Sequence, residues 1–240
     1  MKNNDLAPRR KAAKHGSVFF APWRLCATFS FLLSFALALS AADVTDKGVL
    51  KILANGQQIG TERFEIAPTD DGYKASAELR IKMPNGQDTN ETSVLLLDKQ
   101  LLLTSYTRDQ KSPKKAGIKV EFNKGRATAN YDTPEGKNTL EFFMEPGVVV
   151  LDTNFFHHYF LLLQRYSGEK TKGQNVNVFI PQEATPGMLL LEHLGKDGGN
   201  DKWRAKTEVE ILIWSDGNGH LVKLAVPAAK VEIVREEAKR

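Results

Sequence analysis

"YKASAELRIKM", residues Tyr73 to Met83, is the stretch that decides the fold class. Every second residue is apolar or aromatic, and the residues between them are polar or charged. Successive side chains of a β-strand point to opposite faces of the sheet, so this alternation predicts a strand with one buried face. The same rhythm recurs at residues 118–122, 176–180, 205–213 and 231–233. The sequence therefore predicts a mainly β protein.

Short turn signals separate the predicted strands. They are Asn55-Gly56, Asp71-Gly72, Asn85-Gly86, Lys124-Gly125 and residues 216–219. These residue types tolerate positive φ, and most gaps have the length of hairpin connections. We expect about ten to twelve strands, mostly antiparallel. They would form a strongly curved sheet with the shape of a partly open barrel.

One segment, "NFFHHYFLLLQRY" at residues 154–166, breaks the alternation. At about 100° per residue, its aromatic and leucine side chains fall on a stripe about 160° wide, except Leu161, which lies on the opposite, polar side. We expect one amphipathic helix near residues 153–167, with this stripe packed on the concave face of the sheet. His157 and His158 fall on the other side, so we expect two solvated imidazoles. Adjacent helical residues diverge too far to chelate one ion, and no metal site is predicted.

The first 42 residues have the layout of a secretory signal peptide. A basic leader precedes the 15-residue apolar run Leu25–Leu39, and small residues follow up to Ala42. The run is shorter than the ~20 residues of a membrane-spanning helix. We expect cleavage and a periplasmic or extracellular protein whose residues 43–240 form a single domain. A retained N-terminal anchor is the alternative.

Removal of this leader changes the bulk chemistry. The chain has 33 basic and 29 acidic residues, of which six and one lie in the leader, so the remainder carries a net charge of −1. The basic pI is therefore no argument for a nucleic-acid partner. The single cysteine, Cys26, also lies in the leader. The exported domain would depend on its core alone, without disulfides.

Ser215, Asp216 and His220 contain the three residue types of a hydrolytic triad. Their spacing is that of a turn between two strands, and no Gly-x-Ser-x-Gly elbow is present. We expect a non-enzymatic protein without a cofactor. Hydrolysis around Ser215 or His220 is kept as a third hypothesis.

Three segments are apolar on both faces, namely Val94–Leu97, Leu101–Leu103 and Met188–Leu191. Such strands need cover on both sides. Either the core has two well-packed layers, or the concave face is too large for one helix and leaves an apolar cavity. Ala75 and Ala77 favour a cavity, because small inward residues leave room.

The runs "VLDTNFFHHYFLLLQRY", "NVNVFIPQ" and "ILIWSDGNGHLVKLAVP" resemble bacterial exported families of unknown function. In these families a helix after a strand is followed by a β-meander with an Asp-Gly turn. Their predicted shape is similar to that of periplasmic lipoprotein carriers, in which a curved antiparallel sheet wraps around a helix. The resemblance implies a fold and a compartment. It supplies no catalytic residue.

Two main functions follow, from different classes. In the first, a cell-envelope protein binds a lipid or other apolar ligand between helix and sheet. The predicted lining residues are Phe156, Tyr159, Phe160 and Leu163 on the helix and Ala75, Ala77 and Leu79 on the sheet. In the second, the core is closed, and a structural or interaction module contacts protein partners through an exposed sheet edge or loops. A cavity of several hundred Å³ between helix and sheet separates the two.

Overall fold

The computed structural model describes residues 44–82, 86, 88–166 and 173–237. The predicted signal peptide lies outside these residues. These described residues belong to one compact unit. Within the described part of this unit, no helix is long and apolar enough to span a membrane.

Strands account for most of the described chain. They are β1 (Asp46–Ala54), β2 (Gln57–Thr69), β3 (Gly72–Lys82), β4 (Asp88–Asp98), β5 (Leu103–Ser112), β6 (Ala116–Asn123), β7 (Arg126–Thr133), β8 (Gly136–Phe143), β9 (Val149–Val150), β10 (Gln174–Ile180), β11 (Thr185–Asp197), β12 (Asn200–Lys206), β13 (Glu210–Ser215), β14 (Leu221–Val226) and β15 (Val231–Arg235). The helical elements are α1 (His158–Leu163) and the 3₁₀ turns η1 (Pro181–Glu183) and η2 (Pro227–Ala229).

All the strands join one sheet in the order β8-β7-β6-β5-β4-β3-β2-β1-β15-β14-β13-β12-β11-β10-β9. Neighbours pair antiparallel, except that β9 runs parallel to β10. Strand β1 pairs with β15, so the two ends of the strand sequence meet in the middle of the sheet. The free edges are therefore β8 and β9, and the sheet is not closed into a barrel.

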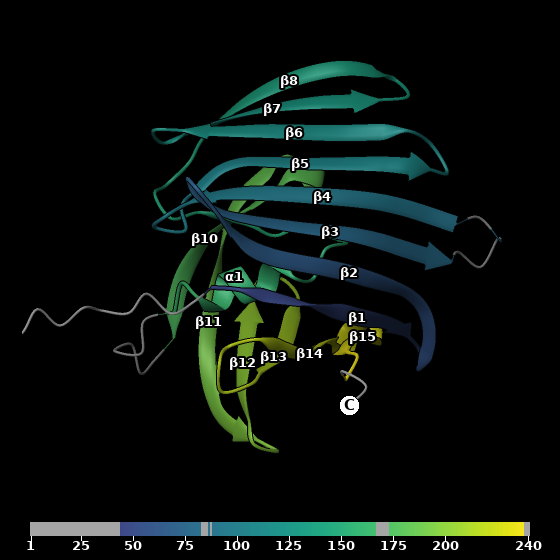
Figure 1. Cartoon of the computed structure of the whole chain (residues 1–240), viewed down its shortest axis with the longest axis vertical. Coiled ribbons are helices and arrows are strands. Elements are labelled where there is room, and N and C mark those ends of the chain that lie inside the picture. The colour runs from purple at the N-terminus through teal and green to yellow at the C-terminus, as the bar shows by residue number, and fades with distance from the viewer. Residues whose placement is uncertain (1–43, 83–85, 87, 167–172, 238–240) are drawn as a thin grey trace, which may run out of the picture. The chain divides into compact units, whose positions relative to one another are not determined.

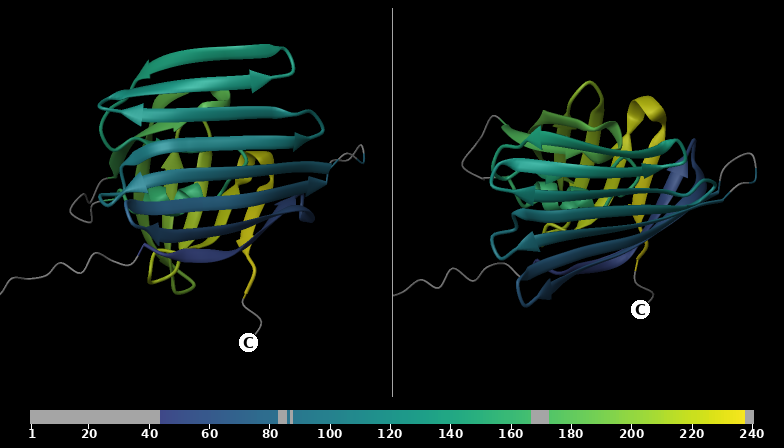
Figure 2. Two further views of the ribbon diagram at one scale, coloured as in Figure 1. Left: turned by 45° about the horizontal axis from the view of Figure 1, so that its top comes forward. Right: turned by 90° about the horizontal axis from the view of Figure 1, so that it is seen from above.

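The sheet bends so that strands β1 to β8 lie on one side and β10 to β15 on the other, with α1 between them (Figures 1 and 2). Inward residues of both sides and the side chains of α1 form one hydrophobic core. The predicted mainly β, curved antiparallel sheet is confirmed. The predicted strand number was too low, because polar strands such as β8 bury almost nothing and lack the alternation that signals a strand.

The helix differs from its prediction in length. It covers six residues, His158 to Leu163, instead of about fifteen, and all six are buried. The prediction assumed one solvated face, but α1 lies between two layers of the sheet. A helix in that position is apolar on most sides, because every side meets protein.

Candidate functional site

The structure brings the predicted ligand-lining residues together in the hydrophobic core. Those of β3 face inward, those of α1 are buried, and Phe156 is partly buried against the same core. The full set is Ala75, Ala77, Leu79, Phe156, Tyr159, Phe160 and Leu163.

The space between α1 and the sheet is nearly filled. A cavity that reaches α1 at Leu161, and the sheet at Leu95 and Leu97, measures about 10 Å³. That volume is at the lower limit for one water molecule. An acyl chain could enter there only if side chains of α1 moved.

The histidine prediction was wrong, because His157 and His158 are both fully buried. The ring of His157 stacks on Phe64, with centroids 5.8 Å apart, and the ring of His158 lies edge-on to Tyr106. The helical wheel failed because it assumed one solvated side, whereas protein covers both of these side chains. Their ring centroids are only 4.4 Å apart.

Glu62 of β2 holds the start of α1. Its two carboxyl oxygens accept the backbone N–H groups of Phe156, at 2.7 Å, and of His157, at 3.2 Å. No side chain of the helix segment itself caps this end. Glu62 therefore supplies from a distant strand the acceptor that a local N-cap residue usually provides.

Glu62 also forms a short contact with the His157 ring, with 2.5 Å between Oε1 and Nδ1. Burial raises the pKa of Glu62 to about 8. Burial lowers the pKa of His157 to about 3, because the charged imidazolium loses its hydration. At neutral pH the pair therefore holds one proton and carries no net charge.

A second group of buried polar side chains adjoins this pair. Arg108 donates to Glu91, with 2.9 Å from Nε to Oε2, and its Nε lies 3.9 Å from Asp152. Asp152 accepts hydrogen bonds from the hydroxyl of Tyr106 and from the backbone N–H of Asn154. The side-chain amide of Asn154 donates back to Glu91. Burial and the Asp152 charge raise the pKa of Tyr106.

We call these residues the buried polar cluster: Glu62, Glu91, Tyr106, Arg108, Asp152, Asn154, His157 and His158. Four of them come from β2, β4 and β5, and four from the segment between β9 and α1 together with the first residue of α1. The cluster thus attaches this segment to the inner face of the sheet.

In the described chain, no group of three or more His, Cys, Asp or Glu is placed to hold a metal ion.

Sequence reasoning missed this cluster, although a signal was present. Glu62 has the same alternation phase as Phe64 and Ile66, and Glu91 has the phase of Leu95 and Leu97. A charged residue in phase with buried neighbours must point inward. It then needs a partner from elsewhere in the chain.

The Ser215, Asp216 and His220 side chains form turn and packing contacts. The Ser215 hydroxyl accepts from the indole of Trp203, at 3.0 Å. Asp216 accepts from the backbone N–H groups of Asn218 and His220, and its Oδ2 lies 3.1 Å from Nδ1 of His220. Among the described contacts, no hydrogen bond joins Ser215 to His220.

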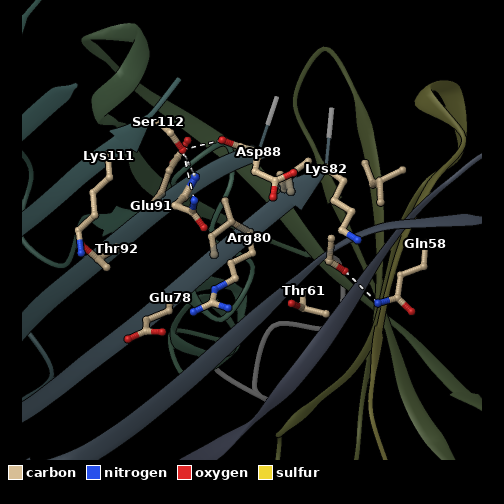
Figure 3. A pocket seen from close by; sticks show the side chains of 15 residues that line it. Gln58, Thr61, Glu78, Arg80, Lys82, Asp88, Glu91, Thr92, Lys111 and Ser112 are labelled. Atoms are coloured by element: carbon tan, nitrogen blue, oxygen red, sulfur yellow. Dashed lines mark hydrogen bonds between the residues drawn. The ribbon is translucent and has the colours of Figure 1, made fainter. Parts of the chain in front are cut away.

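A pocket of about 790 Å³ lies across β2 to β5 (Figure 3). Its labelled side chains include Glu78, Arg80, Thr92 and Lys111. Glu78 and Arg80 flank the inward-facing Leu79 on β3, so this pocket is on the face opposite α1. Side chains of both charge signs line it, which does not suit an apolar ligand.

The edge strand β8 is the most exposed strand of the sheet. All its residues are exposed except Phe142, and Phe143 is 81 % exposed. The backbone N–H of Met144 donates to Gly125 of the β6–β7 turn, at 2.8 Å. Hydrogen-bonded pairs alternate in an antiparallel ladder, so the even-numbered residues of β8 bond to β7. The backbone groups of the odd-numbered residues therefore point away from the sheet.

Two solved structures are similar to this chain. A β-barrel-like protein of the domain of unknown function DUF1849 from Brucella abortus has a TM-score of 0.52 at 10% identity, over 81% of this chain and 96% of that chain. A DUF1089 family protein from Pseudomonas aeruginosa has a TM-score of 0.47 at 11% identity, over 70% of this chain and 90% of that chain. No family model and no curated protein matches the chain.

The first likeness supports the β-barrel-like fold, and at 10% identity it shows the fold alone. That neighbour is a domain of unknown function, which is consistent with the expected resemblance to uncharacterised families. The similarity to lipoprotein carriers stays a prediction.

Proposed function

We propose that the protein is a non-enzymatic, exported cell-envelope module that binds a protein partner along the open edge of β8. The observation that carries this proposal is the eight-residue edge with outward backbone donors and acceptors. An exposed sheet edge is a template on which another strand can pair, and many proteins bind partners in this way. The nearly filled space around α1 favours this function over an internal ligand.

The asymmetry of the two edges supports the choice of β8. The other edge, β9, has two residues, and both are buried. In Figure 1 β8 forms the outer border of its side of the sheet, with no described segment beyond it. A partner strand can therefore reach β8 without any rearrangement of the core.

Site-specific crosslinking in the host cell tests this function. A p-benzoylphenylalanine at position 139, in the middle of β8, should give one defined protein adduct on irradiation. The control position is 128 on β7, which lies on the same face but between two paired strands. Equal adducts from both positions, or none from position 139, would contradict the proposal.

Export is part of the proposal and rests on the sequence of the leader. Protein recovered from the envelope fraction should begin at Asp43. Recovery of the intact chain from the cytoplasm would contradict export.

Binding of an apolar ligand is the second candidate, because the predicted lining residues of β3 and α1 do meet in one core. It requires α1 to move, since about 10 Å³ is open beside it. Displacement of a fluorescent fatty acid measures this directly. Saturable binding, weakened by Phe160→Trp, would support the ligand function, and no saturable binding would remove it.

A further inference from the structure

We infer that the partner on β8 is β8 of a second copy of this chain, paired antiparallel about Thr139. The inference rests on the proposed role of β8 as an interaction edge and adds the identity of the occupant. Such pairing would join two sheets into one, with a twofold axis through the pair of Thr139 residues.

The backbone restricts the possible registers. The residues with outward backbone groups are Lys137, Thr139, Glu141 and Phe143, as the register with β7 requires. Two such edges form a hydrogen-bonded ladder only if odd-numbered residues meet odd-numbered residues. From one allowed antiparallel register to the next, the residue opposite a given position therefore changes by two.

The side chains select one of these registers. Pairing about Thr139 places Lys137 opposite Glu141 of the other copy, twice by symmetry, and Thr139 opposite itself. Opposite charges and threonine pairs directly across two strands are favourable. A register centred one residue earlier sets Lys137 against Thr139, and one centred one residue later sets Lys137 against Phe143, so neither places opposite charges across the joint.

The charges of β7 extend this match. Lys137 lies 3.6 Å from Asp132, and Glu141 lies 3.7 Å from Arg126, on the same face of the sheet. Across the joint, the order becomes Asp132, Lys137, Glu141, Arg126, with the last two from the second copy. The signs alternate along this row, so each charge has opposite neighbours. Lysine on an edge strand usually discourages pairing, but here the second copy presents the matching acid.

The face opposite α1 carries these charges, and the core face is compatible as well. Asn138 of one copy meets Leu140 of the other, and Leu140 is 36% exposed in the single chain. Pairing would cover part of this leucine. No side chain of the buried polar cluster takes part, so dimer formation and folding of the core are separable.

Charge reversal tests the inference by sedimentation velocity on the protein purified from its host. The wild type should be a dimer. Lys137→Glu and Glu141→Lys should each weaken dimerisation about tenfold or more, because each sets like charges opposite each other twice. An equimolar mixture of the two variants should restore dimers, because every pair at the joint is then complementary.

Lys119→Glu is the matched control, since Lys119 is an exposed lysine on the same face of β6, away from the edge. It should leave the dimer unchanged, and all variants should keep the wild-type circular dichroism spectrum. A monomeric wild type would overturn the inference, as would a dimer that ignores both reversals or a mixture that stays monomeric. A monomer that crosslinks from position 139 to a different protein would overturn only the second-copy inference and leave the proposed function standing.

Discussion

Glu62 and Arg108 are ionisable side chains at positions where the alternation of their strands demands burial. Each meets its partners in the segment that leads into α1 or on a neighbouring strand. An ionised group without a partner in such a place costs several kcal/mol, so these contacts fix which segment lies over which strand. The position of the β9–α1 segment therefore depends on single residues of the sheet.

Glu62 gives the free energy of unfolding a specific pH dependence. Its folded pKa of about 8 lies above its unfolded value of 4.5, so its contribution is full below pH 4.5 and is lost as pH rises through 8. His157 and His158 have folded pKa values below 6.5, so their contributions are full above pH 6.5 and are lost as pH falls. We therefore expect greatest stability near pH 6.5.

Urea unfolding at a series of pH values measures this dependence. From pH 6.5 to 8 the wild type should lose about 2 kcal/mol, from about 1.4 kcal/mol for each pH unit. Glu62→Gln should remove this loss, whereas Glu65→Gln, an exposed position on the same strand, should keep it. The same loss in Glu62→Gln as in the wild type would show that Glu62 is not the group responsible.

Arg108→Met tests the second part of the cluster. The substitution leaves Glu91 and Asp152 buried without their cation, which should lower the free energy of unfolding by about 3–5 kcal/mol. Lys119→Met removes an exposed ion pair with Glu121 and should leave the urea midpoint unchanged. If Arg108→Met also left the midpoint unchanged, the cluster would not stabilise the fold.

At the scale of elements, the alternation predicted strands correctly where one face of the sheet is buried and the other is exposed to solvent. The alternation in β3 predicted both the strand and its inward residues, including Ala75 and Leu79. It could not find β8, because an exposed edge strand needs no apolar alternation. The helix was predicted at the right place but too long. Its predicted solvated face was also wrong, because apolar periodicity cannot distinguish a helix buried on one face from a helix buried on all sides.

Leu161 separates these two descriptions of α1. The predicted amphipathic helix sets Leu161 on its polar side, where truncation is almost free, but in the structure it is 5% exposed. Leu161→Ala and Leu162→Ala should each cost about 2–5 kcal/mol in urea unfolding. Leu194→Ala, at a 44% exposed position, is the control and should cost much less. A negligible effect of Leu161→Ala would mean that one side of α1 faces solvent.

At the scale of the whole molecule, the pairing of β1 with β15 lets a chain of simple hairpins enclose a single segment between the two sides of the sheet. The sequence indicated a curved sheet around a helix. It did not indicate that the enclosed segment would bury polar side chains together with apolar ones. That outcome depends on contacts between residues far apart in the chain, such as Glu62 with His157. With the interior occupied, the surfaces left for function are the outer face and the β8 edge.

The most direct test of this enclosed core is a pH titration of the imidazole signals by nuclear magnetic resonance, with His157 and His158 assigned by substitution. In the folded protein we expect neither signal to show a titration step between pH 5 and 7, because both rings stay neutral and buried. In urea both should titrate near pH 6.5, the value of an exposed histidine. A folded protein in which either ring titrates near pH 6.5 would contradict the account.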